Sequence, residues 1–558
     1  MRFARYFFVC LSGLLLTAGV QAAEAGQTPP AQQPAPAQQP ATPQQPMPAQ
    51  PTGVQMPAAA PMPGESNGPA RPLSIDEAVA LALKNNLGLE IERLNPQIEQ
   101  ELVAQARAPY LPTLQASFGK SGSTFEPTDF TQGEEIVKTS GMTSTFSFVQ
   151  PSLPLLNTNI QAQVVGGRTS TNELRPRFNP NLSSRINLQA SQPLWRDLII
   201  NPVKTRIEQA VISRQIADIT LRERVVGTER NVRQAYWQLV GAIERLNVAR
   251  QNLDLSNEQL RANKVRVEVG TMAPIDIIAA QAEVAGNEEA VITAEAGIRS
   301  AEDNLRTLIF DPSSTEFWNE RIQPTNAPQL QPLEVNLDAA IKTALESRTD
   351  IVTARKNMQI TDLSVKLAKN DISPDISLNA SVNANGSGGT RFNYIPGTFD
   401  LDPLDPSVDR SFGSALADTF GFAYPQWNVN VSYAYPLGKQ IEKATHARVT
   451  LQRRQAESQL KQLEMGITQQ VRQVARNVNT NYQRVQTTRV ARELAEQRLG
   501  AQQKRFEVGL STLFELTQAQ RDVVLQRNNE LNAIIDYNQS LVDFQLVQVA
   551  PLGGGGQF

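Results

Sequence analysis

The side chains that most often perform catalysis are scarce in this sequence. The chain of 558 residues contains one histidine, His446, and one cysteine, Cys10. Thiol or imidazole catalysis and Cys/His metal sites therefore have almost no residues from which to form. No complete Walker-type nucleotide-binding element occurs. We expect no enzyme activity, no cofactor and no metal ion. The net charge of −3 argues against nucleic acid as a partner.

Two related segments, each centred on a Glu-Val-Gly turn, carry the polar residues of most interest. Arg266–Val284 reads RVEVGTMAPIDIIAAQAEV and Arg505–Val523 reads RFEVGLSTLFELTQAQRDV. In each, a polar helix pattern ends at the turn and a second helix pattern follows. Gly270 and Gly509 suit the left-handed conformation that ends a helix, and Pro274 suits the first turn of the next one. Hydroxyl residues able to cap the next helix follow both turns: Thr271, Ser511 and Thr512.

The two turns recur because a larger unit of the chain recurs. One block aligns with a later one at an offset of 262 residues, which pairs Pro112 with Pro374 without a gap. A second block aligns at an offset of 239 residues and pairs Gly270 with Gly509. Such unbroken registers are improbable for chance similarity, so we predict an internal duplication. Its expected parts are a first repeat at 73–310, a linker at 311–332 and a second repeat at 333–550.

The ends of the chain differ in composition from these repeats. Residues 1–22 combine Arg2 and Arg5 with an apolar run and small residues before a cleavage point after Ala22, which predicts a secretory signal peptide. Residues 23–72 are rich in Pro, Gln and Ala, which predicts a disordered tether. Residues 551–558 are expected to form a flexible tail. Cys10 falls within the signal peptide, so the exported chain would need no disulfide.

Four short segments alternate apolar and polar residues as β-strands do. In the last of them, Trp427, Val429, Val431 and Tyr433 share one face, opposite asparagine and serine residues. The segments TLQASFG, RINLQASQPL and DISLNASVN follow the same pattern, and STFSFV and NIQAQVV in the loop at 121–182 alternate as well. A soluble sheet would alternate similarly, whereas a membrane sheet would turn its apolar face to lipid.

The remaining pattern is that of very long helices. Val225, Val232, Leu239, Leu246 and Leu253 are spaced by sevens, and the spacing continues to Val267. A sustained repeat of this kind predicts a left-handed supercoil. The helix from about 203 to 267 would be roughly 95 Å long at 1.5 Å per residue. The second copy keeps the same frame but breaks it at Arg492, which predicts either an interhelical polar contact or a shifted heptad. Shorter helices are expected at 74–108 and 337–370, each before a proline.

Taken together, these features resemble the TolC-like outer-membrane efflux proteins. The resemblance covers nearly all of residues 73–550. It depends on the paired repeats, the strand ends SQPLW (Ser191–Trp195) and AYPLG (Ala434–Gly438), and the two Glu-Val-Gly turns. The tether is not part of the family pattern.

The resemblance implies a mixed α and β membrane protein in the outer membrane of a Gram-negative bacterium, with helices projecting into the periplasm. Four strands from each chain of a homotrimer would form a 12-stranded β-barrel in outer-membrane lipid, continuous with an antiparallel coiled-coil helical barrel. The channel would be a passive exit duct for an inner-membrane pump of the RND or ABC type, including type I secretion systems. A periplasmic adaptor (membrane fusion protein) would join the two. Aromatic residues suited to the lipid interface are Trp195, Trp427, Tyr433 and Tyr435.

The resemblance also assigns roles to the two turns, which would form the periplasmic tips. The tip residues that would contact the adaptor are Val269, Gly270, Thr271, Val508, Gly509 and Leu510. Glu515 matches an acidic position that rings the channel entrance, and Asp276 is its equivalent in the first repeat. The family's second acidic position is Gln518 here, and Ser511 stands where some members place a basic latch residue. If three Glu515 side chains met at one axis, their repulsion would raise their pKa values.

Two other interpretations of the sequence remain open at this stage. A non-conducting structural or adhesin-like periplasmic coiled coil would also contain long heptad helices, but it would need neither the strand pairs nor the duplication. An envelope enzyme is disfavoured by the scarcity of catalytic side chains. For the acid Glu515, the alternative to an entrance role is a solvated residue at a helix N-terminus, which the helix dipole favours.

Overall fold

The computed structural model describes residues 70–552 apart from 129–131, 133–134, 174–175, 311–320, 397, 399, 404 and 406. The predicted signal peptide and residues 23–69 of the predicted tether lie outside the described residues, as do half of the linker and most of the tail. Residues 70–72, which the sequence placed in the tether, belong to strand β1 (Ala70–Leu73). This strand pairs in parallel with β6 (Arg321–Pro324).

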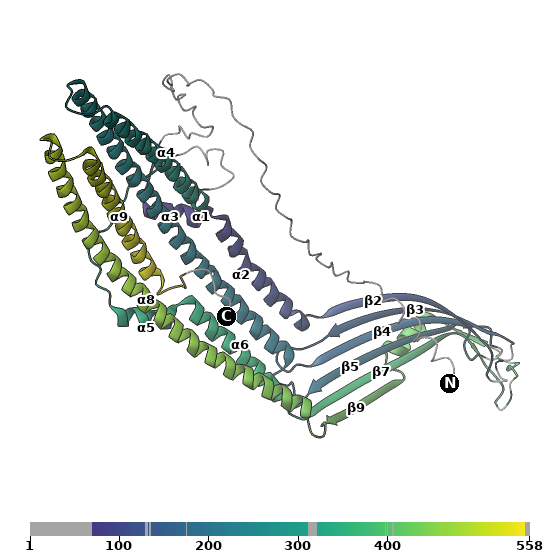
Figure 1. The fold of residues 1–558 in the computed structure, drawn as a ribbon. Helices are drawn as coiled ribbons and strands as arrows, with labels where there is room; N and C mark the ends of the chain where they lie inside the picture. The colour runs from purple at the N-terminus through teal and green to yellow at the C-terminus, as the bar shows by residue number, and fades with distance from the viewer. Residues whose placement is uncertain are drawn as a thin grey trace, which may run out of the picture. The chain divides into compact units, whose positions relative to one another are not determined.

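Long helices dominate the described part of the chain and lie side by side (Figure 1). They form two antiparallel hairpins: α3 (Pro202–Glu268) with α4 (Ile275–Ile309), and α8 (Gln440–Glu507) with α9 (Leu513–Leu546). The predicted long helices are confirmed, since α3 has 67 residues and α8 has 68. Each is therefore about 100 Å long. None of the helices in the described ranges has a stretch apolar and long enough to cross a bilayer.

Each of the two shorter predicted helices is in fact a pair, so the prediction of one continuous helix is wrong. The pairs are α1 (Ile75–Asn85) with α2 (Leu87–Ala106), and α5 (Leu337–Ser347) with α6 (Thr349–Asp371). A 3-10 turn, η1 (Ala108–Tyr110), follows α2. The physical cause of each break lies in a single residue.

At the first break, Asn86 leaves the helical conformation with ψ 115° and its side-chain oxygen accepts a hydrogen bond from the Leu89 amide at 3.1 Å. Asparagine therefore caps the second helix instead of continuing the first. At the second break, Arg348 is buried and donates to the Val547 carbonyl oxygen and to the Gln470 side chain. The periodicity of the sequence gives no sign of such a tertiary contact.

The sheet contains more strands than the sequence predicted. Four strands per chain were expected, but six long strands and one short strand occur in the described residues. In spatial order the long strands are β2 (Thr113–Phe125), β3 (Val137–Gln150), β4 (Asn159–Thr171), β5 (Asn181–Pro193), β7 (Asp375–Phe392) and β9 (Pro425–Ala434). The short β8 (Ser407–Arg410) also pairs with β7. The extra strands β3 and β4 contain the alternating segments STFSFV and NIQAQVV, so the expectation that this loop could hold strands is confirmed.

The antiparallel register brings the apolar side chains of all six long strands onto one face of the sheet. One row across the sheet is Leu114, Phe148, Ala162, Leu188, Val382 and Trp427. The opposite face carries polar side chains, as in the row Ser191, Asn379 and Asn430. A one-residue slip of any strand would transfer its apolar set to the polar face, so the alternation itself specifies the register.

The strands continue from the end of the helices that is opposite the two turns (Figure 1). A short helix, α7 (Phe412–Phe420), precedes β9 and packs against β5 and β7. Two apolar cores hold the helices together. One contains Ala78, Ala82, Val232 and Leu239, and the other contains their sequence equivalents Ala340, Ala344, Val471 and Val478.

Candidate functional site

The two predicted turns have the same backbone structure. Gly270 has φ +81° and Gly509 has φ +77°, so the predicted left-handed conformation is confirmed at both. The amide of Thr271 donates to the Arg266 carbonyl at 2.8 Å, and the amide of Leu510 donates to the Arg505 carbonyl at 2.8 Å. These bonds satisfy carbonyls that the helix end would leave unpaired, which is the Schellman arrangement.

Both tips present apolar side chains to solvent. Val269 is 73% exposed and Leu510 is 78% exposed. Three large exposed side chains that the sequence analysis did not predict extend the same surface: Ile275, Ile278 and Phe514. Arg266 at the end of α3 stacks over the Phe506 ring of α8, with 4.7 Å from the guanidinium carbon to the ring centroid, so the two hairpins are adjacent near their tips. Exposed apolar groups gathered at one end of a protein are typical of a surface that binds another protein.

The residues predicted to cap the second helix of each hairpin behave differently at the two tips. Thr512 caps α9 as predicted, because its hydroxyl accepts from the Glu515 amide and the Glu515 carboxylate accepts from the Thr512 amide. Thr271 does not cap α4. Its hydroxyl instead donates back to the Arg266 carbonyl at 3.0 Å, and α4 begins after Pro274 without a side-chain cap.

Glu515 is held by its own turn. The Ser511 hydroxyl donates to its carboxylate at 2.7 Å, and the Gln502 amide donates to the same oxygen at 3.3 Å. The Ser511 hydrogen bond, followed by that of the Thr512 amide, keeps the pKa of Glu515 below its usual range. Within the single chain the pKa of Glu515 is therefore lowered, whereas crowding of three carboxylates at one axis would raise it.

The other predicted entrance residues are not all brought together. Gln518 donates to Asp522 at 3.1 Å, and Asp522 also pairs with Arg498 at 3.1 Å. Asp276 lies in the first turn of α4, on the other hairpin. Of the four predicted residues, only Ser511 and Glu515 are joined by a hydrogen bond in the described structure.

Polar contacts that sequence reasoning missed join the first hairpin to α9. Nearest the tips, Arg521 of α9 bonds Glu283 of α4 at 2.5 Å. Farther from the tips, the contacts continue as Arg527 with Gln251, Arg245 with Asn532, and Arg230 with Asp543. Their partners are hundreds of residues apart and have no shared spacing, so no sequence signal identifies them.

The heptad break at Arg492 marks an interhelical polar contact, which is one of the two alternatives that the sequence analysis predicted. Arg492 of α8 bonds Glu530 of α9 at 2.5 Å and Glu496 one turn farther on at 2.9 Å. Arg527 bonds the other oxygen of Glu496 at 2.9 Å. Two arginines and two glutamates thus tie the second hairpin together at its middle.

The sheet side of the molecule carries the four aromatic residues predicted for the lipid interface. Trp195, Trp427, Tyr433 and Tyr435 are all exposed. Trp427 and Tyr433 lie on the apolar face of β9 and are six residues apart, so about 20 Å separates them along the strand. The apolar side chains Val429 and Val431 lie between them on the same face.

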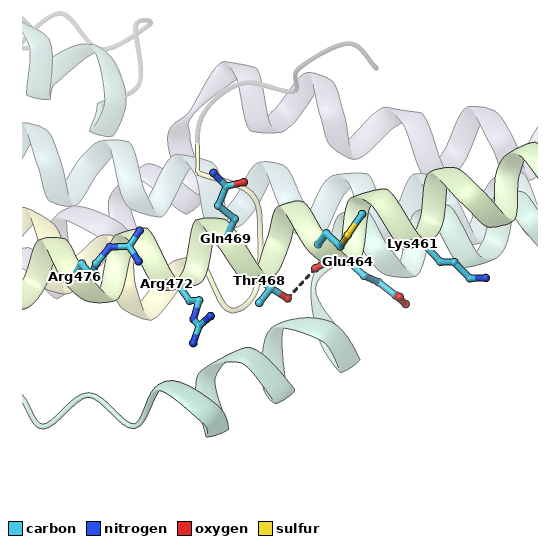
Figure 2. A pocket seen from close by; sticks show the side chains of 7 residues that line it. Lys461, Glu464, Thr468, Gln469, Arg472 and Arg476 are labelled. Atoms are coloured by element: carbon cyan, nitrogen blue, oxygen red, sulfur yellow. Dashed lines mark hydrogen bonds between the residues drawn. The ribbon is translucent and has the colours of Figure 1, made fainter.

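The structure shows no convergent catalytic set in the part of the chain that it describes. A hollow of about 540 Å³ lies along α8, and the side chains that line it spread out along one helix (Figure 2). They include Lys461, Glu464, Arg472 and Arg476. Within the described ranges no group of three or more His, Cys, Asp and Glu side chains could hold a metal ion.

Comparison with known proteins identifies the family. A model of the outer membrane efflux protein family matches residues 78–309 and again residues 340–547. Outer membrane protein TolC of Vibrio cholerae is 23% identical over 389 residues, which is 68% of this chain and 79% of that protein. The cobalt-zinc-cadmium resistance protein CzcC of Cupriavidus metallidurans is 28% identical over 175 residues, so the match spans 30% of this chain and 42% of the relative.

A solved structure shares the fold. The outer membrane protein VceC of Vibrio cholerae superposes with a TM-score of 0.59 at 13% identity, covering 85% of this chain and 96% of that one. The predicted resemblance and the predicted outer-membrane location are confirmed by these matches. With its two family-model matches, its long helical hairpins and its one-sided apolar sheet, the chain belongs to the outer membrane efflux protein family.

Proposed function

We propose that this protein is the passive exit duct of an efflux system. The observation that carries the proposal is the sheet of six long strands, apolar on one face and polar on the other, which continues into helices about 100 Å long. The apolar face would meet lipid and the polar face would line a wet channel. A non-conducting coiled coil does not require such a sheet.

We infer that the chain functions as a homotrimer, because its open sheet needs further copies to close it and the family resemblance implies three. The edge strands β2 and β9 are exposed throughout, and their backbone groups have no partner strand on one side among the described residues. An even number of antiparallel long strands leaves the two edges antiparallel to each other, so β2 of one copy can pair with β9 of the next. Closure removes edges that would otherwise aggregate.

The strand number changes the size of the proposed barrel. Twelve strands would follow from four per chain, whereas three copies of the six long strands seen here would give eighteen. Barrel diameter grows roughly in proportion to strand number. We therefore propose a wider barrel than the sequence analysis expected.

The internal duplication is supported by two independent features. The family model matches twice, once in each of the proposed repeats at 73–310 and 333–550. The positions paired by the sequence offsets, such as Ala82 with Ala344 and Val232 with Val471, are buried in corresponding cores. Two hairpins per chain would let three chains enclose a tunnel.

The tips are the proposed contact site for a periplasmic adaptor, which would link the duct to an RND or ABC pump. Their exposed apolar side chains support this role. For the entrance we propose that the Arg521–Glu283 ion pair, rather than Ser511, latches the two hairpins together, because among the described residues it is the salt bridge between them that lies nearest to the tips. Glu515 remains a candidate for cation selection at the entrance.

The test is single-channel recording of the purified protein in planar bilayers, with detergent-resistant trimers assayed in the same preparation. We expect conducting trimers. Deleting residues 137–171, which removes β3 and β4, should lower the conductance, because the barrel would lose six of its eighteen strands. A non-conducting monomer would contradict the duct, and an unchanged conductance after the deletion would contradict the wider barrel alone.

Mutation of the latch separates its role from that of Glu515. Glu283→Gln should increase the open fraction of the channel, and exchange of the two charges in the double variant Glu283→Arg/Arg521→Glu should restore the wild-type open fraction. Glu515→Gln should lower cation selectivity instead. An open fraction that does not respond to either latch variant would exclude the pair as a latch.

A further inference from the structure

Helix α7 lies directly on the sheet, in contact with its backbone. A Cβ atom at Gly386 would fall 1.9 Å from the Ala415 carbonyl oxygen of α7, and one at Gly388 would fall 2.8 Å from the Ser411 carbonyl oxygen. The Phe412 ring occupies the space over Gly166, 3.2 Å from where its Cβ would be. These glycines on β4 and β7 form a flat seat that any side chain would disrupt.

The seat belongs to the apolar face of the sheet. Side chains alternate along a strand, so Gly386 points to the same side as Ala384 and Val382. Val382 lies in the apolar row that ends at Trp427. Ala384 is fully buried. The helix is further fixed by the Thr419 hydroxyl, which donates to the Ser184 carbonyl oxygen of β5 at 3.2 Å.

The position of the seat along β7 corresponds to the edge of a membrane. Apolar side chains on this face run from Ile376 to Ala384, a stretch of nine residues. A membrane-spanning β-strand needs about 9–11 residues. The seat begins at Gly386, immediately beyond this apolar stretch and on the side away from the long helices.

The outer surface of α7 is suited to a lipid interface. Residues 411–424 contain one charged side chain, Asp418, which is neutralised by Arg410 at 2.7 Å. The large exposed side chains are aromatic: Phe412, Phe420, Phe422 and Tyr424. Phe420 is 56% exposed and Tyr424 is 65% exposed, and both lie on the chain just before Trp427. Aromatic residues are enriched where acyl chains meet headgroups, and helices with one apolar side lie in that plane.

We propose that α7 and the segment that follows it bind lipid at the headgroup–acyl boundary of the leaflet farther from the helices, and so fix the depth of the sheet in the membrane. The occupant of this surface is lipid, because the seat begins directly beyond the apolar stretch that ends at Ala384 on the same face of β7. This inference depends on the proposed function, in which that face meets lipid.

The test is site-directed spin labelling in liposomes of phosphatidylethanolamine and phosphatidylglycerol. Single cysteines are introduced into the full chain that carries Cys10→Ser, as Phe420→Cys, Val431→Cys in the apolar stretch of β9, and Glu493→Cys on α8 as the aqueous reference. The ratio of collision rates with oxygen and with a water-soluble nickel complex reports depth. We expect the ratio for the label at 420 to be several-fold higher than that at 493 and lower than that at 431.

Three results would overturn the proposal. Equal ratios at 420 and 493, with a lipid-like ratio at 431, would place α7 in water and leave the duct intact. A label at 420 shielded from both reagents would show that protein, such as a second copy, covers α7. Aqueous ratios at both 420 and 431 would reject the proposed function together with this inference.

A pair of glycine variants tests the seat itself. Gly386→Ala introduces a methyl group against the backbone of α7, whereas nothing lies within 4 Å of a Cβ at Gly119 on β2. In the Phe420→Cys background, we expect Gly386→Ala to lower the oxygen-to-nickel ratio toward that of residue 493, and Gly119→Ala to leave it unchanged. An unchanged ratio in folded, trimeric Gly386→Ala protein would contradict the role of the seat.

Discussion

Replacement of Gly509 by alanine should loosen the second tip without affecting the rest of the protein. At φ +77° an L-residue is in the left-handed region, which costs about 1–2 kcal/mol. Nothing lies within 4 Å of a Cβ at this position, so no clash adds to the backbone cost. Alanine also restricts the unfolded chain, which offsets about 0.4–1 kcal/mol. The net expected loss is about 1 kcal/mol in the local stability of the turn.

Hydrogen exchange measured by mass spectrometry detects such a local change. The Leu510 amide is bonded to the Arg505 carbonyl at 2.8 Å and exchanges only when the turn opens. A loss of about 1 kcal/mol should speed this exchange about fivefold, since about 1.4 kcal/mol corresponds to a factor of ten. The melting temperature of the protein should stay the same, because the tip lies about 100 Å from the sheet.

The control is Gly500→Ala, within α8 and also free of contacts to a Cβ. This glycine is in a helix interior, so alanine should stabilise it by about 0.5–1 kcal/mol and slow nearby exchange. If Gly509→Ala exchanges at the wild-type rate, or if both variants change exchange in the same direction, the assignment of strain to the left-handed residue is refuted.

The same experiment separates the shape of the tip from its contact surface. Leu510→Ser removes an exposed apolar side chain but keeps the amide that closes the turn. We expect wild-type exchange protection in this variant together with reduced export in cells, because only the adaptor surface would be lost. Normal export with Leu510→Ser would show that the tip is a turn without a binding role.

Three further outcomes follow from single contacts. Glu530→Gln should destabilise the second hairpin by about 1.5–3 kcal/mol in denaturant unfolding, since Arg492 would lose one of its charged partners, and the loss should be small if Arg492→Leu is already present. Ser511→Ala should raise the pKa of Glu515. Because the pKa of Glu515 is depressed in the folded tip, the ionised carboxylate stabilises the tip above about pH 4.5, and this stabilisation is lost as the pH falls through the folded pKa. The acid-induced rise in the hydrogen exchange of the tip amides should therefore begin at a higher pH in the variant. Tyr236→Phe leaves two amides of the segment after β6 without their acceptor and should cost about 1–3 kcal/mol, measured as faster proteolysis there.

The elements that could be predicted from the sequence are those set by local periodicity. A seven-residue repeat of apolar side chains and a glycine after Glu-Val define α3, α8 and both turns. Alternation defined β2, β5, β7 and β9. The same rule indicated β3 and β4 only weakly, because many of their positions are Gly, Ser or Thr and fit either face.

The parts that could not be predicted depend on contacts between distant segments. The helix break at Arg348 is fixed by a carbonyl of Val547, and the Arg521–Glu283 pair joins residues 238 positions apart. Helix α7 was not predicted, since its nine residues are shorter than most helices recognisable by pattern. The need for glycine beneath α7 becomes evident only when β7 and α7 are placed together.

Glu515 is engaged in the cap of α9. Its carboxylate accepts from the Thr512 amide and the Ser511 hydroxyl, and turning away would break both bonds. Three carboxylates approaching one axis would also repel each other, which further favours the cap. A latch made by Glu515 would therefore oppose the local structure, whereas the Arg521–Glu283 pair forms without disturbing a helix end. Loss of the cap would then release the negative charge of Glu515 at the entrance. Variants that weaken the cap, such as Thr512→Val, should therefore increase the cation selectivity of an open channel.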